Sequence, residues 1–129
     1  MSTAPIAPHP VTISFDKFWS WLEAHPNCIL RAGTPDAVLF DDEDLHWHFA
    51  PAEDGQRIVQ LLRGKRLLGE LVVAPSAISY VQGAPGESDE EFIFDLFGEV
   101  QTRHDALYQF VLSHGFDEAD EPKGRRWEH

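Results

Sequence analysis

The chain has 129 residues and a formal net charge of −12, with 22 acidic residues against ten lysines and arginines. This acidic excess argues against nucleic acid and anionic membranes as partners, because nonspecific binding to either depends on Lys and Arg. No apolar run approaches the roughly 18 residues of a membrane span, and a hydrophobic content of 43% argues against disorder. The length fits one domain with a core of its own.

The single cysteine, Cys28, excludes an internal disulfide and fits a reducing compartment, so a cytoplasmic location is expected. No neighbour in the sequence would activate its thiol, which predicts a small buried hydrophobe. Residues 1–10 contain three prolines and no basic residue, so they lack the pattern of a signal peptide and are expected to be a disordered lead-in. A single α+β domain is expected over residues 11–116, and a mobile charged tail over 117–129.

A short helix is expected after Ser14, whose hydroxyl can cap the first turn. Pro26 ends it, because a residue that precedes proline avoids the α region. Apolar residues recur at helical spacing between these two signals, at Phe15, Phe18, Trp19 and Leu22.

From residue 28 to 83 the pattern changes to short extended runs separated by turn residues. The links are too short for parallel crossovers, so an antiparallel β-meander of five to six strands is expected. In the third run, Leu45, Trp47 and Phe49 alternate with His46 and His48, which predicts one face on the core and one toward solvent. The expected strands cover residues 28–32, 37–41, 45–50, 57–63, 66–74 and 77–82.

A long helix is expected over residues 89–114. Ser88 and Glu91 have the Ser-x-x-Glu spacing of a capping box, and Gly115 suits a left-handed C-terminal cap. The apolar residues of this helix would cover an arc of roughly 200°, whereas a stripe of about 100° suffices for a core-facing helix. Either the first helix and the chain ends cover the surplus, or the helix forms the seam of a homodimer, which is the assembly that we expect.

The predicted fold is therefore α+β, with an N-terminal helix, an antiparallel β-meander and a long C-terminal helix packed on the sheet. This element order is similar to that of helix-grip ligand-binding domains, a likeness of fold that transfers no ligand. Secretion chaperones and toxin-immunity proteins also include acidic α+β proteins of this size, and no residue motif ties the chain to either.

The acidic residues of the predicted helix are the candidate partner-binding site. Glu91, Asp95 and Glu99 would form a ridge with a spacing of four residues. Like charges at this spacing destabilise a helix by a few tenths of a kcal/mol per pair, and a basic partner would reverse that cost. The sequence thus predicts a non-enzymatic acidic binding or adaptor protein, chaperone-like or immunity-like, that recognises a protein partner with a complementary basic surface.

The alternative is a small-ligand pocket protein or an enzyme, with a cavity between the sheet and the C-terminal helix. His104 falls on the apolar face of the predicted helix, and with Tyr80 and Tyr108 it forms the candidate pocket. No catalytic residue or cofactor is predicted, because the chain has neither a nucleophile elbow nor a glycine-rich phosphate loop. His46 and His48 would lie about 7 Å apart on one strand face. They could share a metal, but no recognised ligand spacing accompanies them, so no metal site is predicted.

Overall fold

The computed structural model describes residues 10–88, 90–98 and 106–116. The expected lead-in, apart from Pro10, and the expected tail lie outside these residues. The elements are, in chain order, β1 (Val11–Ile13), α1 (Phe15–Glu23), the 3₁₀ helix η1 (Pro26–Cys28), β2 (Ile29–Thr34), β3 (Ala37–Phe40), β4 (His46–Glu53), β5 (Gln56–Arg63), β6 (Arg66–Val73), the 3₁₀ helix η2 (Pro75–Ala77), β7 (Tyr80–Pro85), β8 (Phe92–Phe97) and β9 (Tyr108–Leu112).

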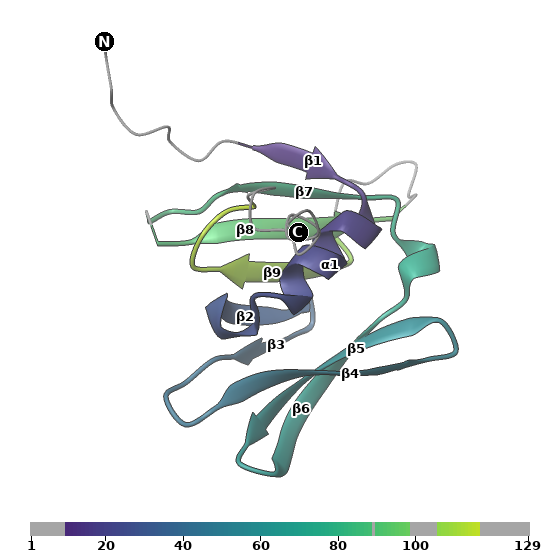
Figure 1. Ribbon diagram of the computed structural model, residues 1–129. Coiled ribbons are helices and arrows are strands. Elements are labelled where there is room, and N and C mark those ends of the chain that lie inside the picture. Colours follow the sequence, from purple (N-terminus) through teal and green to yellow (C-terminus); the bar gives the residue numbers. More distant parts are fainter. Residues whose placement is uncertain (1–9, 89, 99–105, 117–129) are drawn as a thin grey trace, which may run out of the picture.

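The strands form two antiparallel sheets (Figure 1). The larger sheet has the order β1-β7-β8-β9-β2-β3, and the smaller one is the meander β4-β5-β6. The expected meander is therefore divided: β2 and β3 form a hairpin that pairs with β9, while β7 pairs with β1 and β8. The fold is largely β, and the described residues include no helix long and apolar enough to cross a membrane.

Helix α1 confirms the first predicted element. The Ser14 hydroxyl accepts a hydrogen bond from the backbone N–H of Lys17 at 3.1 Å, which satisfies one of the free donors of the first turn. Pro26 then begins η1, so the α-helix has ended at Ala24 as expected. The buried face of α1 consists of Phe15, Phe18, Trp19, Trp21 and Leu22.

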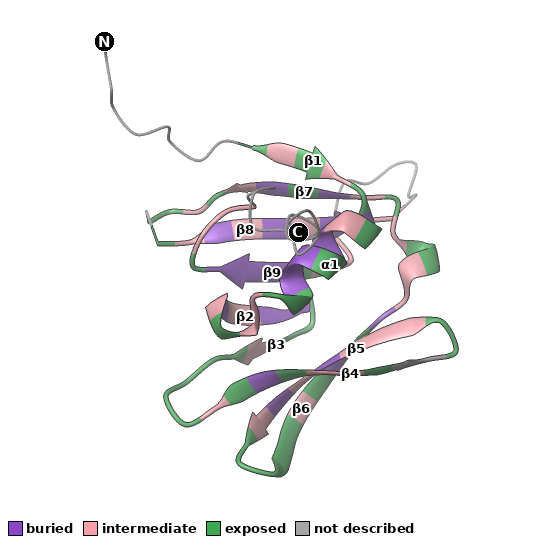
Figure 2. Ribbon diagram, in the orientation of Figure 1, coloured by how far each residue is buried: buried purple, intermediate pink, exposed green. Residues whose placement is uncertain are grey.

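The core lies between α1 and the larger sheet. The ring of Phe18 is 5.0 Å from Phe94 on β8 and 5.7 Å from Phe110 on β9, and all three side chains are fully buried. In Figure 2 the buried residues accordingly follow α1 and the central strands behind it. Aromatic rings at these separations stabilise a fold by more than the burial of their apolar area alone. This contact therefore holds the helix on the sheet.

The smaller sheet packs on the same core through one face. The Trp47 indole N–H donates to the carbonyl of Ile29 at 3.1 Å, and the ring of Phe49 meets Trp19 edge-on at 5.5 Å. Trp47 is buried, whereas His46 and His48 are exposed. The predicted alternation along β4 is confirmed. The other residues of the smaller sheet that belong to the core are Val59, Leu61, Leu71 and Val73.

The prediction of a long C-terminal helix is wrong, and with it the α+β class. Residues 92–97 and 108–112 form β8 and β9, which pair with each other; residues 99–105 lie outside the described part. Burial along β8 alternates with a period of two, through Phe92, Phe94 and Leu96, as a strand requires. The opposite face of β8, which is partly buried, also carries apolar residues. In sequence, a strand that is apolar on both faces gives a hydrophobic pattern similar to that of a helix with a very wide apolar arc.

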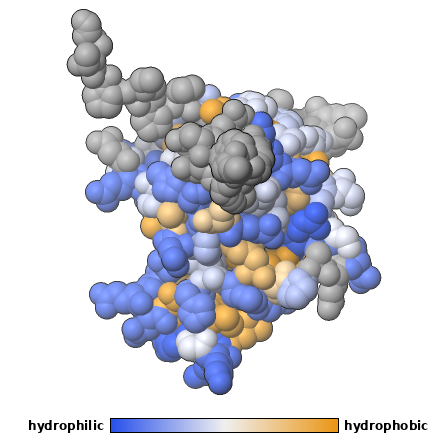
Figure 3. All heavy atoms as spheres, in the orientation of Figure 1, coloured by the Kyte–Doolittle hydropathy of each residue, from blue (hydrophilic) through white to orange (hydrophobic). Residues whose placement is uncertain are grey.

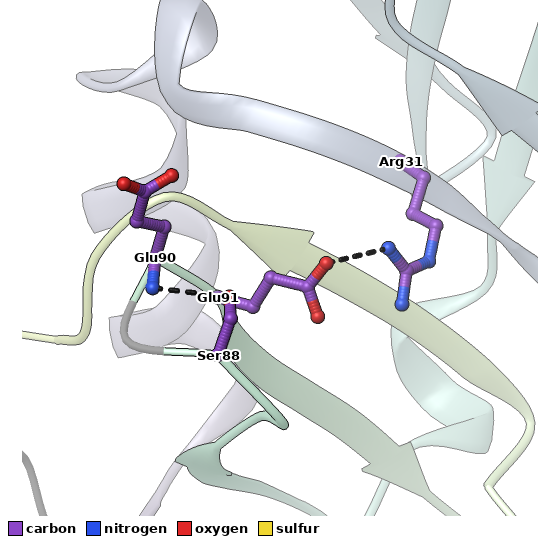
Figure 4. Close-up of polar contacts among 4 residues, drawn as sticks. All are labelled: Arg31, Ser88, Glu90 and Glu91. Carbon is purple, nitrogen blue, oxygen red and sulfur yellow. Dashed lines mark hydrogen bonds and ion pairs between the residues drawn. The ribbon is translucent and has the colours of Figure 1, made fainter.

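The capping-box pattern forms a turn instead of a helix cap. The Ser88 hydroxyl accepts a hydrogen bond from the N–H of Glu90 at 3.2 Å (Figure 4). The backbone nitrogen of Glu91 lies 3.3 Å from the Ser88 carbonyl oxygen. Serine makes the same short-range bonds in turns as at helix starts, so this local pattern does not distinguish the two.

Candidate functional site

The larger sheet has a face that points away from α1, and we call it the outer face. Phe94 and Leu96 point into the core, so the alternate residues Ile93, Asp95 and Phe97 point outward. Residues that lie directly opposite each other on neighbouring antiparallel strands point to the same face of the sheet. The strand register therefore identifies the outward residues of the other strands. In the described chain α1 and the smaller sheet both pack on the inner face. The outer face contains Arg31, Val38, Phe40, Tyr80, Gln82, Ile93, Asp95, Phe97 and Gln109.

A row of polar side chains crosses the centre of the outer face. Gln82 is opposite Asp95, and Asp95 is opposite Gln109. The Gln109 side-chain amide donates to Asp95 Oδ1 at 2.8 Å. This hydrogen bond orients the carboxylate of Asp95, which is half-buried.

An ion pair crosses the outer face next to this row. Arg31 on β2 and Glu91 just before β8 lie on either side of β9, and Arg31 Nη1 is 3.4 Å from Glu91 Oε2 (Figure 4). Val111 on β9 is opposite Arg31, faces outward and is fully buried. Both charged side chains are 30% exposed, so the pair contributes at most about 1 kcal/mol to stability.

A hollow of about 540 Å³ opens on the outer face between the end of β8, the start of β9 and the β2–β3 turn. Its wall combines the Asp95 carboxylate with aromatic and aliphatic side chains. A carboxylate beside aromatic faces suits a cation carried on an apolar stem, such as a lysine or arginine side chain. The lining residues are Thr34, Pro35, Val38, Asp95, Phe97, Ala106, Tyr108 and Gln109.

Two large apolar side chains are exposed beside the hollow. Phe40 is 61% exposed and Val38 is 46% exposed, and both lie on β3, an edge strand of the larger sheet. A phenylalanine this exposed costs free energy in water, and contiguous exposed apolar surface marks interaction sites. The outer face thus carries an apolar margin next to an acidic hollow.

The smaller sheet has a second exposed apolar area, on β6. Leu67 is 49% exposed, and Leu68 and Val72 are exposed to a similar degree. Figure 3 shows apolar atoms gathered over the lower part of the molecule, where Figure 1 places this sheet. His46 and His48 point to this side, but no group of three or more His, Cys, Asp or Glu residues in the described chain could hold a metal ion.

The predicted partner-binding residues meet different surroundings from those expected. With no helix there, Glu91 and Asp95 share a face through strand periodicity and lie about 13 Å apart along the chain, not one helical turn apart. Glu91 pairs with Arg31, and Asp95 accepts from Gln109. The prediction of a helical ridge is therefore wrong, while a binding role for these acidic residues stays a prediction. Glu99 lies outside the described residues.

The predicted pocket residues do not enclose a cavity under a helix, because that helix does not form and α1 fills the inner face. Tyr80 stacks on Phe97 on the outer face, with ring centroids 5.1 Å apart. Tyr108 packs against the core and also lines the hollow. His104 lies outside the described residues.

Cys28 and His114 form a pair that the sequence pattern does not predict. Cys28 Sγ lies 3.2 Å from His114 Nε2, although the two residues are 86 positions apart. Both side chains are half-buried. The pairing of β2 with β9 brings the two segments together, and no local motif could have indicated it.

Comparison with known proteins finds no matching family, no similar curated protein and no similar solved structure.

Proposed function

We propose that this protein binds a protein partner through the outer face of the larger sheet, and that the partner inserts a lysine or arginine side chain into the hollow at Asp95. The observation that carries this proposal is the position of the exposed Phe40 and Val38 beside an acidic hollow. Apolar anchors surrounded by polar groups are the usual composition of a protein-binding surface.

Electrostatics support a basic partner. The net charge of −12 would attract a positively charged protein and raise the association rate at low salt. At close range Asp95 would provide the counter-charge, already oriented by Gln109. A side chain that is held in place before binding loses less conformational entropy on binding, so this carboxylate is well suited to recognition.

The test compares matched variants in affinity capture. Phe40→Ser removes the apolar anchor, and Asp95→Lys reverses the charge in the hollow. Leu67→Ser is the control, because it removes a comparably exposed apolar side chain from the other sheet. The proposal expects one captured protein, rich in Lys and Arg at its contact surface, whose affinity falls about tenfold or more with each outer-face variant. It also expects the control to keep that affinity, and the wild-type affinity to decline with salt.

Two results would overturn the proposal. One is a partner that both outer-face variants retain and that Leu67→Ser loses, which would move the binding surface to β6. The other is self-association that Phe40→Ser abolishes in light scattering, because a second copy of the chain would then be the occupant. Thermal unfolding of each variant shows that the fold is retained.

A further inference from the structure

A cluster of aromatic and titratable side chains lies where α1 and η1 meet the segment after β9. The Ser113 N–H donates to the carbonyl of Cys28 at 2.9 Å and holds the two segments together. Trp21 is at the centre: its ring centroid lies 4.8 Å from that of His25, 5.6 Å from His114 and 5.3 Å from Phe116. These contacts fix the rings of one cluster, and His114 within it contacts Cys28, the only cysteine of the chain.

The hydrogen bonds of His114 determine which of its nitrogens can act as a base. Nδ1 lies 3.1 Å from the carbonyl oxygen of Gly115. A carbonyl only accepts, so Nδ1 carries the proton and Nε2 keeps a free lone pair. Nε2 lies 3.2 Å from Cys28 Sγ and therefore accepts the thiol hydrogen. A nucleophile, a base within reach of it and a group that orients the base form the arrangement of activated thiols.

A second observation in the same cluster points to a ligand. Trp21 is fully buried, and its indole N–H has no hydrogen-bond partner in the described structure. A buried donor without an acceptor costs about 1–3 kcal/mol, so such a group in a folded protein calls for an explanation. A bound molecule with a carbonyl oxygen would supply the acceptor that Trp21 lacks.

We propose that Cys28 is a reactive thiol, with His114 as its base, and that it is modified by small neutral α,β-unsaturated carbonyl compounds. His114 Nε2 takes the proton from Sγ, and the sulfur attacks the β carbon. The S–C bond forms as the C=C π bond opens, and the resulting enolate takes the proton back from His114. Planar, conjugated compounds of this kind stack on aromatic rings such as those of this cluster, and the net charge of −12 disfavours anionic reagents.

The test follows alkylation by N-ethylmaleimide at neutral pH, with mass spectrometry counting the single adduct. A free cysteine is only a few per cent thiolate at this pH, so a working base should make the folded chain react about tenfold or more faster than the urea-unfolded chain. Because the chain has one cysteine, the unfolded protein is an internal reference that needs no substitution. Equal rates in the two states would overturn the proposal.

Variants separate the base from the packing of the cluster. His114→Ala should lower the rate to that of the unfolded chain, and added imidazole should restore it. His25→Gln alters the neighbouring ring without removing the nitrogen at the sulfur, so it should keep the fast rate. Equal loss in both variants, or no response to imidazole, would show that His114 only supports the structure. If His114→Ala does not fold by circular dichroism, His114→Gln replaces it and should show the same loss of rate.

Discussion

Replacing Phe94 with alanine tests the β8–β9 pair most directly. Phe94 is fully buried, and its ring centroid lies 5.0 Å from Phe18, 5.3 Å from Trp21 and 5.1 Å from Phe92. Phe97, three residues further along, points to the outer face and is half-buried. The two phenylalanines therefore sit on opposite sides of the same strand, and their substitutions should differ in cost.

The magnitudes follow from burial. Phe94→Ala removes a fully buried ring and leaves a cavity, which costs about 3–5 kcal/mol. Phe97→Ala loses only partial burial and one stacking contact with Tyr80, which together amount to about 1–2 kcal/mol. With a urea m-value of about 1–3 kcal/mol/M for a chain of this size, Phe94→Ala should lower the unfolding midpoint by roughly 2 M, and Phe97→Ala by less than about 1 M.

The assay is urea unfolding followed by tryptophan fluorescence and far-UV circular dichroism. Phe94→Leu is the milder variant if Phe94→Ala does not fold. A cost for Phe97→Ala equal to or above that for Phe94→Ala would refute the strand, because a helix over residues 89–114 would place Phe97 within its apolar face and Phe94 at the margin. Unequal m-values would indicate a change in the unfolded state and call for a calorimetric measurement.

Three further substitutions test separate parts of the fold. Ser14→Ala removes the cap of α1 and should cost about 1 kcal/mol, seen as a melting temperature a few degrees lower; no change would mean that the cap is dispensable. Gly83→Ala would place a Cβ 2.7 Å from the Phe94 ring and 2.9 Å from the Phe92 ring, so urea unfolding should show a loss of about 1–3 kcal/mol, and unchanged stability would contradict this packing. Arg31→Met breaks the ion pair on the outer face and should change stability by less than about 1 kcal/mol in calorimetry, whereas a loss above about 2 kcal/mol would indicate a desolvated pair.

The parts of the fold that the sequence predicts correctly have local signals. Ser14 and Pro26 delimit α1, and the strands β2 to β6 follow runs of extended residues separated by turns. At Gly64 the β5–β6 turn uses a positive φ of 61°, a conformation that glycine adopts without strain. The alternation of Trp47 with His46 and His48 likewise gives the buried face of β4 directly.

The candidate site was predictable only in part. Asp95 was selected for a helical spacing that the chain does not adopt, yet a separation of four residues also keeps two side chains on one face of a strand. Phe40, Val38 and the hollow were not predicted, because exposure on a sheet edge depends on which strands pair beside it. In the described structure, β3 has β2 on one side only.

By itself the sequence determined the acidic charge, the capped first helix and the extended character of the middle of the chain, since each depends on composition or on residues within one turn or strand. Tertiary structure decided the conformation of β8 and β9, because a segment with apolar residues on both faces carries no clear hydrophobic period in its sequence. It also decided the Arg31–Glu91 and Cys28–His114 contacts, which join residues 60 and 86 positions apart. Contacts at such separations form only when strands pair, and that pairing is chosen by the free energy of the whole core rather than by any local pattern.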